Sequence, residues 1–280
     1  MSRTPRLPRT STGTGTGTGT RTRRVATALA AVALLAPLAA CGGSDDDEDD
    51  SGSGAKGGGK TELTVLAAAS LTDVFETAGD AYEKEHPGTT LRFSFEGSQE
   101  LAAKVRQGAP ADALVTADTK TMDDLSGETG EPTVIAKNRL VIAVGKGNPK
   151  KVEALDDLDA SGLKVVLAAS EVPVGRYSKE VLDARKVAVK PVSQEPNVRA
   201  VLSKVQLGEA DAGLVYKTDV TAAKGKAEGV DIPDDQNALA SYPAAALKGS
   251  KHGDEAGEFV EWLSSAAAQK ILRDAGFQQP

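Results

Sequence analysis

The sequence predicts an α/β protein with two lobes and a ligand cleft between them. Short apolar segments alternate along the chain with segments in which apolar residues recur every three or four positions. Strands and helices that alternate in this way are typical of βαβ units, which favours parallel sheets over a sandwich. The alternation breaks near residue 139 and then starts again, so we expect a second lobe. Ligands of such proteins bind in the cleft between the lobes.

The first lobe is predicted to begin with three strands separated by two helices. The strands are expected over 62–69, 89–95 and 111–116. The first helix, over 73–85, has one apolar face, made of Val74, Phe75, Ala78, Ala81 and Tyr82. The second helix opens at Gly97-Ser98 and ends at Gly108.

The second lobe repeats this pattern. Strands are expected over 139–144, 163–168 and 212–216, and helices over 177–185 and 198–205. A final helix is expected after this lobe, over 255–275. We expect the chain to cross between the lobes near Arg139 and to return near Ala238. The first lobe then consists of 61–139 and 238–280, and the second of 140–237.

The first forty residues predict a secretory signal peptide, 1–40, rather than part of the fold. They contain six arginines and no acidic residue, end in an apolar run over 25–40, and are followed by Cys41, the one cysteine of the chain. Leu38-Ala39-Ala40-Cys41-Gly42 resembles a bacterial lipobox. The resemblance implies cleavage before Cys41 and its lipidation, which would hold the protein at the outer face of the cytoplasmic membrane. The alternative is an ordinary signal peptide followed by a chance cysteine.

Residues 41–60 predict a flexible tether, lipidated at its first residue. Gly, Ser and an acidic run over 45–50 offer no large apolar side chain to bury. About twenty residues of such a chain span on the order of 25 Å. The six carboxylates lack an apolar scaffold that would fix their geometry, so we expect them to be solvated rather than to bind a metal ion.

The charge of the chain excludes one class of partner. Without the six arginines of the signal peptide, 27 basic residues stand against 40 acidic ones, which gives a net charge of −13. Such a chain does not attract nucleic acid or an anionic membrane surface. If it binds an anion, it must do so through a local site and not through its overall field.

Ser70 and Ser98 each lie between a predicted strand and a predicted helix. The first N–H groups of a helix lack partners within it, and the helix dipole makes this end partially positive. An anion can therefore be held there without a lysine or an arginine. Each serine can equally be explained as an ordinary helix cap, because serine is among the commonest residues at that position.

Five motifs follow one another along the chain: Ala67-Ala68-Ala69-Ser70-Leu71-Thr72, Gly108-Ala109-Pro110-Ala111-Asp112, Val172-Pro173-Val174-Gly175-Arg176-Tyr177, Asn197-Val198-Arg199 and Gly213-Leu214-Val215-Tyr216. Together they closely resemble the molybdate-binding proteins of bacterial ABC importers, over about 63–277. The resemblance implies the type II periplasmic-binding-protein fold. It also implies an extracytoplasmic lipoprotein that captures molybdate, or tungstate, and delivers it to the membrane subunits of an ABC importer. Such a protein is expected to be a monomer without catalytic residues, without a cofactor, and without a metal beyond the molybdenum of the oxyanion.

Carried over position by position, the resemblance assigns the molybdate contacts to Ser70 and Ser98 in the first lobe and to Val174, Val198 and Tyr216 in the second. The serines offer hydroxyl and backbone N–H donors, the valines offer only backbone N–H donors, and Tyr216 offers its phenol. A site with donors alone disfavours protonated phosphate, whose O–H would lack an acceptor.

The chain departs from the family pattern just before Ser98. Glu96-Gly97-Ser98-Gln99 stands where family members often carry a run of small hydroxyl residues. The aligned serine is kept, but Glu96 places a carboxylate near the dianion unless its side chain points away.

Three other functions remain open at this point. A receptor for another tetrahedral oxyanion, such as sulfate, would use the same donors, and cavity size must separate the ions. An enzyme on the same scaffold has little support, because His86 and His252 stand beside predicted turns and the sequence has no HExxH or phosphate-loop motif. A surface adhesion module would bind no small ligand.

Overall fold

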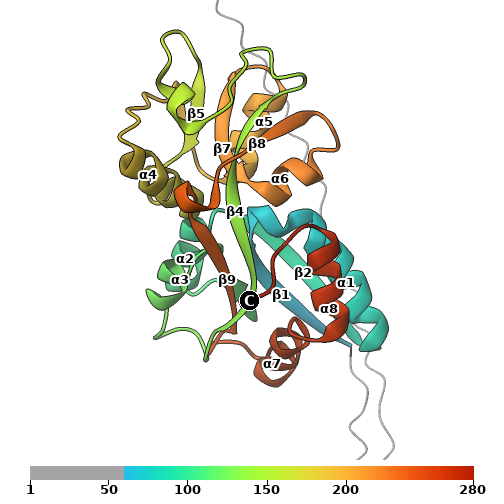
Figure 1. The fold of residues 1–280 in the computed structure, drawn as a ribbon. Coiled ribbons are helices and arrows are strands. Elements are labelled where there is room, and N and C mark those ends of the chain that lie inside the picture. The colour runs from blue at the N-terminus through green and yellow to red at the C-terminus, as the bar shows by residue number, and fades with distance from the viewer. Residues whose placement is uncertain (1–59) are drawn as a thin grey trace, which may run out of the picture. The chain divides into compact units, whose positions relative to one another are not determined.

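The computed structural model describes residues 60–280. The predicted signal peptide, Cys41 and the predicted tether up to residue 59 lie outside the described residues. Within residues 60–280, no helix is both long enough and apolar enough to cross a membrane. Eight strands form a path of hydrogen-bonded neighbours in the order β2-β1-β3-β9-β4-β7-β5-β6, and β8 pairs with β4 beside this path (Figure 1).

The first lobe is organised around parallel strands β1, β2 and β3, with β9 antiparallel to β3. Its strands are β1 Thr61–Ala68, β2 Thr89–Glu96, β3 Ala113–Val115 and β9 Leu239–Ala246. Its helices are the short turn η1 Ala69–Leu71, α1 Thr72–Glu85, α2 Ser98–Arg106, α3 Thr119–Asp123, α7 Gly253–Trp262 and α8 Ala266–Asp274. The apolar face predicted for the first helix is buried at Val74, Phe75, Ala78 and Tyr82.

The second lobe has its own group of strands. They are β5 Val165–Ala168, β6 Ser193–Glu195, β7 Ala212–Tyr216 and β8 Ala227–Asp231. Its helices are η2 Leu155–Asp159, α4 Pro173–Arg185, α5 Val198–Gln206, α6 Lys217–Ala222 and η3 Asp234–Gln236. Strand β5 runs parallel to both β6 and β7. Each parallel strand therefore ends close to the start of a helix, which places helix N-termini along one edge of the sheet.

Strand β4, Thr133–Gly145, contributes to both lobes. Its first part, up to Arg139, pairs with β9, whereas the part from Leu140 pairs with β7 and β8. Figure 1 shows β4 running from the lower lobe into the upper one. The two lobes are thus joined by a continuous strand, and they meet along the boundary that this strand crosses.

Three predicted features differ from the structure. The sheets are mixed rather than parallel, because β4 and β9 run antiparallel to their neighbours. Helix α4 begins at Pro173 and not at Tyr177; proline suits the first helical turn because its φ is fixed and its missing N–H is not needed there. The final predicted helix is in fact two helices, because Ser265 caps a new one by accepting a hydrogen bond from the Ala268 N–H.

Candidate functional site

A small pocket lies between the two lobes, next to the carboxyl ends of β1 and β7. We call it the interlobe pocket. The five residues assigned to the ligand from the sequence all line it: Ser70, Ser98, Val174, Val198 and Tyr216. Residues that are far apart in the chain are therefore brought together by the folding of the two lobes against each other.

Three helices begin at the interlobe pocket. Ser98 is the first residue of α2, Val198 is the first residue of α5, and Val174 is the second residue of α4. N–H groups in the first turn of a helix have no carbonyl partner within that helix, and the helix dipole adds partial positive charge. Both lobes thus present backbone donors to the pocket, an arrangement that suits an anion.

Neither serine acts as a helix cap. The cap position of α2 is Gly97, whereas the buried Ser98 accepts a hydrogen bond from the Ala117 N–H at its Oγ, at 3.0 Å. Ser70 lies in the turn η1, and its Oγ is 3.0 Å from the hydroxyl of Tyr242. The capping explanation is therefore wrong for both residues. Since the Ser98 oxygen accepts, its hydroxyl proton is still available for donation.

Tyr216 is 1% exposed, and its hydroxyl has no hydrogen-bond partner among residues 60–280. Its ring packs edge-on against Tyr242, with 5.9 Å between the ring centroids. Burial raises the pKa of the Tyr216 phenol well above its usual value, so the group keeps its proton and acts as a donor. A buried hydroxyl without a partner is costly, and the pocket that it lines is where a ligand can supply an acceptor.

The two valines face the pocket at the starts of their helices, where their backbones can contribute. Gly175, next to Val174, fits so closely that a Cβ would lie 2.0 Å from the carbonyl oxygen of Ala169. A side chain at 175 would push the start of α4 away, so this glycine determines where the Val174 N–H lies. The start of α5 is held in another way, because Asn197 caps it with its side chain.

Glu96 also lines the interlobe pocket, but its carboxylate has partners. Its Oε1 forms an ion pair with Lys104 on α2 and accepts a hydrogen bond from Ser94. The positive charge of Lys104 offsets the repulsion that a lone carboxylate would exert on a dianion.

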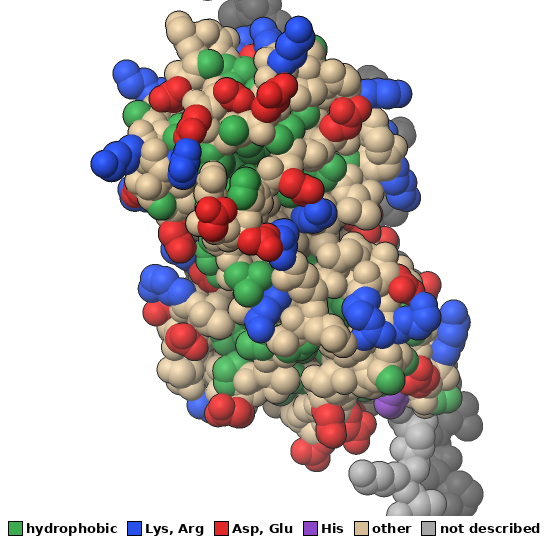
Figure 2. Space-filling view, viewed as in Figure 1, with side chains coloured by type: hydrophobic (Ala, Val, Ile, Leu, Met, Phe, Trp, Pro, Cys, Tyr) green, Lys and Arg blue, Asp and Glu red, His purple; other side chains and the backbone are tan. Residues whose placement is uncertain are grey.

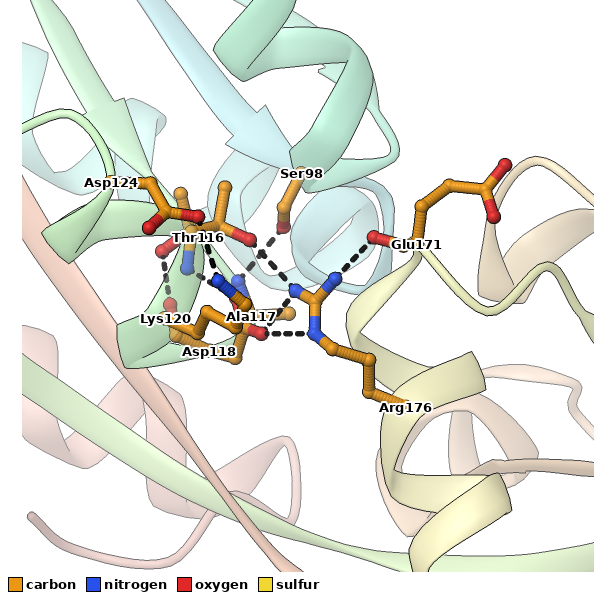
Figure 3. A network of polar contacts seen from close by, with 9 residues as sticks. Ser98, Thr116, Ala117, Asp118, Lys120, Asp124, Glu171 and Arg176 are labelled. Atoms are coloured by element: carbon orange, nitrogen blue, oxygen red, sulfur yellow. Dashed lines mark hydrogen bonds and ion pairs between the residues drawn. The ribbon is translucent and has the colours of Figure 1, made fainter.

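The prediction from the sequence misses two arginines beside the pocket. Arg176 on α4 pairs with Asp118 (Figure 3), and Arg199 on α5 pairs with Asp73 and Asp219. Both arginines stand in the first turn of their helix, where the dipole disfavours a cation. Both arginines belong to motifs quoted in the sequence analysis. Their unfavourable position at a helix start is the signal from which the sequence could have identified them.

The face of the molecule seen in Figure 2 has no patch of one charge sign. Figure 2 shows acidic and basic side chains mixed over the visible face of both lobes and at the boundary between them. No group of three or more His, Cys, Asp or Glu side chains within residues 60–280 is arranged to hold a metal ion. The donors of the interlobe pocket are therefore the feature of this region that suits an anion.

Comparison with known proteins agrees with this geometry. Residues 63–278 match the family model described as bacterial extracellular solute-binding protein. The molybdate-binding protein ModA of Mycobacterium tuberculosis is 37% identical over 255 residues, which cover 90% of this chain and 97% of that protein. YvgL of Bacillus subtilis, named as an ABC transporter substrate-binding lipoprotein, is 35% identical over 78% of this chain and 86% of its own length. The structure of the periplasmic molybdate-binding protein of Azotobacter vinelandii, 22% identical, superposes with a TM-score of 0.67 over 78% of this chain and 99% of that one.

The fold and the pocket between its lobes define a bacterial extracellular solute-binding protein. Within this class, the chain belongs to the molybdate-binding protein ModA family. The prediction of the periplasmic-binding-protein fold is confirmed, as is the prediction of a binding protein rather than an enzyme.

Proposed function

We propose that this protein binds molybdate in the interlobe pocket, outside the cytoplasm, and delivers it to the membrane subunits of an ABC importer. The ligand contacts are Ser70, Ser98, Val174, Val198 and Tyr216. The names of the ModA relatives support molybdate as the ligand.

One observation carries the proposal most directly. The Tyr216 hydroxyl is buried without a partner in the described part of the chain, and it lines the same pocket as two serines and three helix starts. Hydrogen bonds to a charged group contribute about 1.5–3 kcal/mol each. Several such bonds to one dianion offset the several kcal/mol that its desolvation costs.

The kind of donor bears on selectivity. The one carboxylate at the pocket, that of Glu96, is already paired with Lys104. Protonated phosphate would therefore bring an O–H without a free acceptor, which disfavours it relative to fully ionised oxyanions. Molybdate and tungstate have the same shape and charge, so we expect both to bind. Sulfate is smaller, and contacts set for the larger ions would hold it less well.

The organisation of the chain is part of the proposal. The first lobe spans 61–139 and 238–280, and the second spans 140–237. The change of β4 partners after Arg139 and the start of β9 at Leu239 support these bounds. We propose that Cys41 is lipidated and anchors the protein at the outer face of the cytoplasmic membrane. The lipoprotein name of the relative YvgL supports this.

Calorimetric titration of the purified protein with molybdate, tungstate, sulfate and phosphate tests the proposed function. We expect heat of binding at one site for molybdate and tungstate, weaker binding of sulfate, and none for phosphate. Tight sulfate binding without molybdate binding would show a different oxyanion receptor. No binding of any of the four ions would contradict the proposal.

A pair of variants tests the contacts. Ser98→Ala removes a hydroxyl donor and should weaken molybdate binding about ten- to a hundredfold. Val198→Ala keeps its backbone N–H, so the affinity should change by less than about 1 kcal/mol. The reverse order of effects would show that the donors are assigned wrongly.

A further inference from the structure

Arg176 and Arg199 both reach from the second lobe to the first. Arg176 joins α4 to the start of α3, and Arg199 joins α5 to the start of α1. In Figure 1, α4 and α3 lie toward the left of the molecule, whereas α5 and α1 lie toward the right. Both arginines belong to motifs beside the ligand pocket, yet neither lines that pocket. Their contacts therefore act on the pocket through other residues.

Arg176 holds the segment that supports Ser98. Its Nε donates to Asp118 Oδ2 at 3.0 Å, and its Nη2 donates to the same carboxylate and to Thr121 Oγ1. Asp118 is buried, with its side chain 5% exposed. The preceding residue, Ala117, donates its N–H to Ser98 Oγ. Figure 3 shows Ser98 and Arg176 approaching the Ala117-Asp118 segment from different elements. A shift of Arg176 would therefore be passed on to the neighbour of Ser98.

Arg199 holds the turn that carries Ser70. Its Nη1 lies 2.7 Å from Asp73 Oδ2, and its Nη2 donates to the carbonyl oxygen of Ser70 at 3.3 Å. Within its own lobe, its Nε lies 2.8 Å from the fully buried Asp219. This contact is an ion pair without an aligned hydrogen bond. Asp219 in turn accepts from the N–H of Tyr216 at 3.0 Å. The guanidinium thus connects Tyr216 in one lobe to Ser70 in the other.

Both contacts depend on the lobes being together. If the lobes separate, Arg176 loses Asp118 and Thr121, and Arg199 loses Asp73 and the Ser70 carbonyl. Asp118 would lose the charge that compensates its burial, whereas Asp219 would keep Arg199 within its own lobe. Opening therefore breaks the contacts that hold the segments of Ser98 and Ser70.

We infer that Arg176 and Arg199 are positioning residues that clasp the closed lobes on two sides of the pocket and slow the release of the bound oxyanion. This inference rests on the proposed function. The arginines are not ligands: each fixes a segment that carries or supports a ligand serine. Their removal should speed dissociation and leave association nearly unchanged, because encounter takes place with the lobes apart.

The test compares dissociation rates of molybdate from the full protein. Protein loaded with radioactive molybdate is mixed with an excess of unlabelled molybdate, and the loss of label is followed over time. Arg176→Gln, Arg199→Gln and Asp73→Asn should each release the ion about tenfold faster. The dissociation constant from calorimetry should rise by the same factor, which leaves the calculated association rate unchanged. Arg199→Lys keeps the charge beside Asp73 and should restore part of the slow release.

A matched control is Lys179→Gln, which removes an exposed ion pair within α4 that does not reach the other lobe. Its release rate should equal that of the unaltered protein. Asp73 is half-exposed, so Asp73→Asn still tests the contact of Arg199 if Arg199→Gln does not fold. Unchanged release from Asp73→Asn and from each folded arginine variant, with molybdate still bound, would overturn the clasp and leave the proposed function standing. An unaltered protein that binds no tetrahedral oxyanion would overturn both.

Discussion

Tyr216→Phe should affect ligand binding and protein stability in different ways. In the described structure the Tyr216 hydroxyl is buried and donates to no protein acceptor. Its removal therefore costs no hydrogen bond within the protein, and the unfolding free energy without ligand should stay the same or rise by about 1 kcal/mol. If the hydroxyl donates to a bound dianion, the same change removes about 1.5–3 kcal/mol of binding free energy, or about ten- to a hundredfold in affinity.

Urea unfolding in the absence of oxyanion and calorimetric titration with molybdate measure the two quantities separately. Tyr242→Phe is the matched control, because the Tyr242 ring is equally buried but its hydroxyl lies 3.0 Å from Ser70 Oγ. That variant should lose about 1 kcal/mol of stability even without ligand. A Tyr216→Phe protein that loses stability and keeps its affinity would refute the reasoning.

Further predictions concern the backbone, a buried charge and the membrane anchor. Gly175→Ala should lower the unfolding free energy, measured by urea titration, by about 1–3 kcal/mol, and it should weaken molybdate binding, because the new Cβ would lie 2.0 Å from the Ala169 carbonyl oxygen. In the control Gly257→Ala, in α7, the new Cβ meets no other atom, so the unfolding free energy should stay the same or rise slightly. Burial raises the pKa of Asp219 to about 6, so the folded state holds a proton that the unfolded state has lost above about pH 4. The stability of the unaltered protein relative to Asp219→Asn should therefore fall by about 3 kcal/mol between pH 4 and pH 6, and a difference that rises over this range would contradict the shift. Cys41→Ser should move the protein from the membrane fraction to the medium or leave it unprocessed, as fractionation would show, whereas unchanged membrane association would contradict lipidation.

Much of the fold could be predicted because its local patterns are strong. The alternation of strand and helix and the apolar face of α1 depend on residues close together in the sequence. Strand β9 is different, since Leu239–Ala246 is rich in alanine and obtains its place by pairing with β3 and β4, which are distant in the chain. Helices α3 and α6 have five and six residues and are too short to show a helical period.

The site could be predicted only in part from the chemistry of its residues. The hydroxyl donors of serine and tyrosine can be recognised from the residue type. Val174 and Val198 would donate from the backbone N–H, which every residue except proline has, so their side chains do not identify them. Only the order of motifs in the family singled them out. The ion pairs of Arg176 and Arg199 could not be predicted from the sequence for another reason. Arg176 and Asp118 stand 58 residues apart, and their pairing exists only once two lobes have folded and met.

The direction of β1 has a practical consequence for measuring this protein. The strand runs from Thr61 to Ala68, and Ala68 lines the interlobe pocket. Eight residues of strand rise about 26 Å, so Thr61 lies at the end of β1 that is far from the pocket. A fluorophore, tag or sensor surface attached at the start of β1 would sit well away from the ligand entrance. Attachment at this end should therefore leave the lobes free to open and close, which makes it the preferred point for building an oxyanion sensor from this protein.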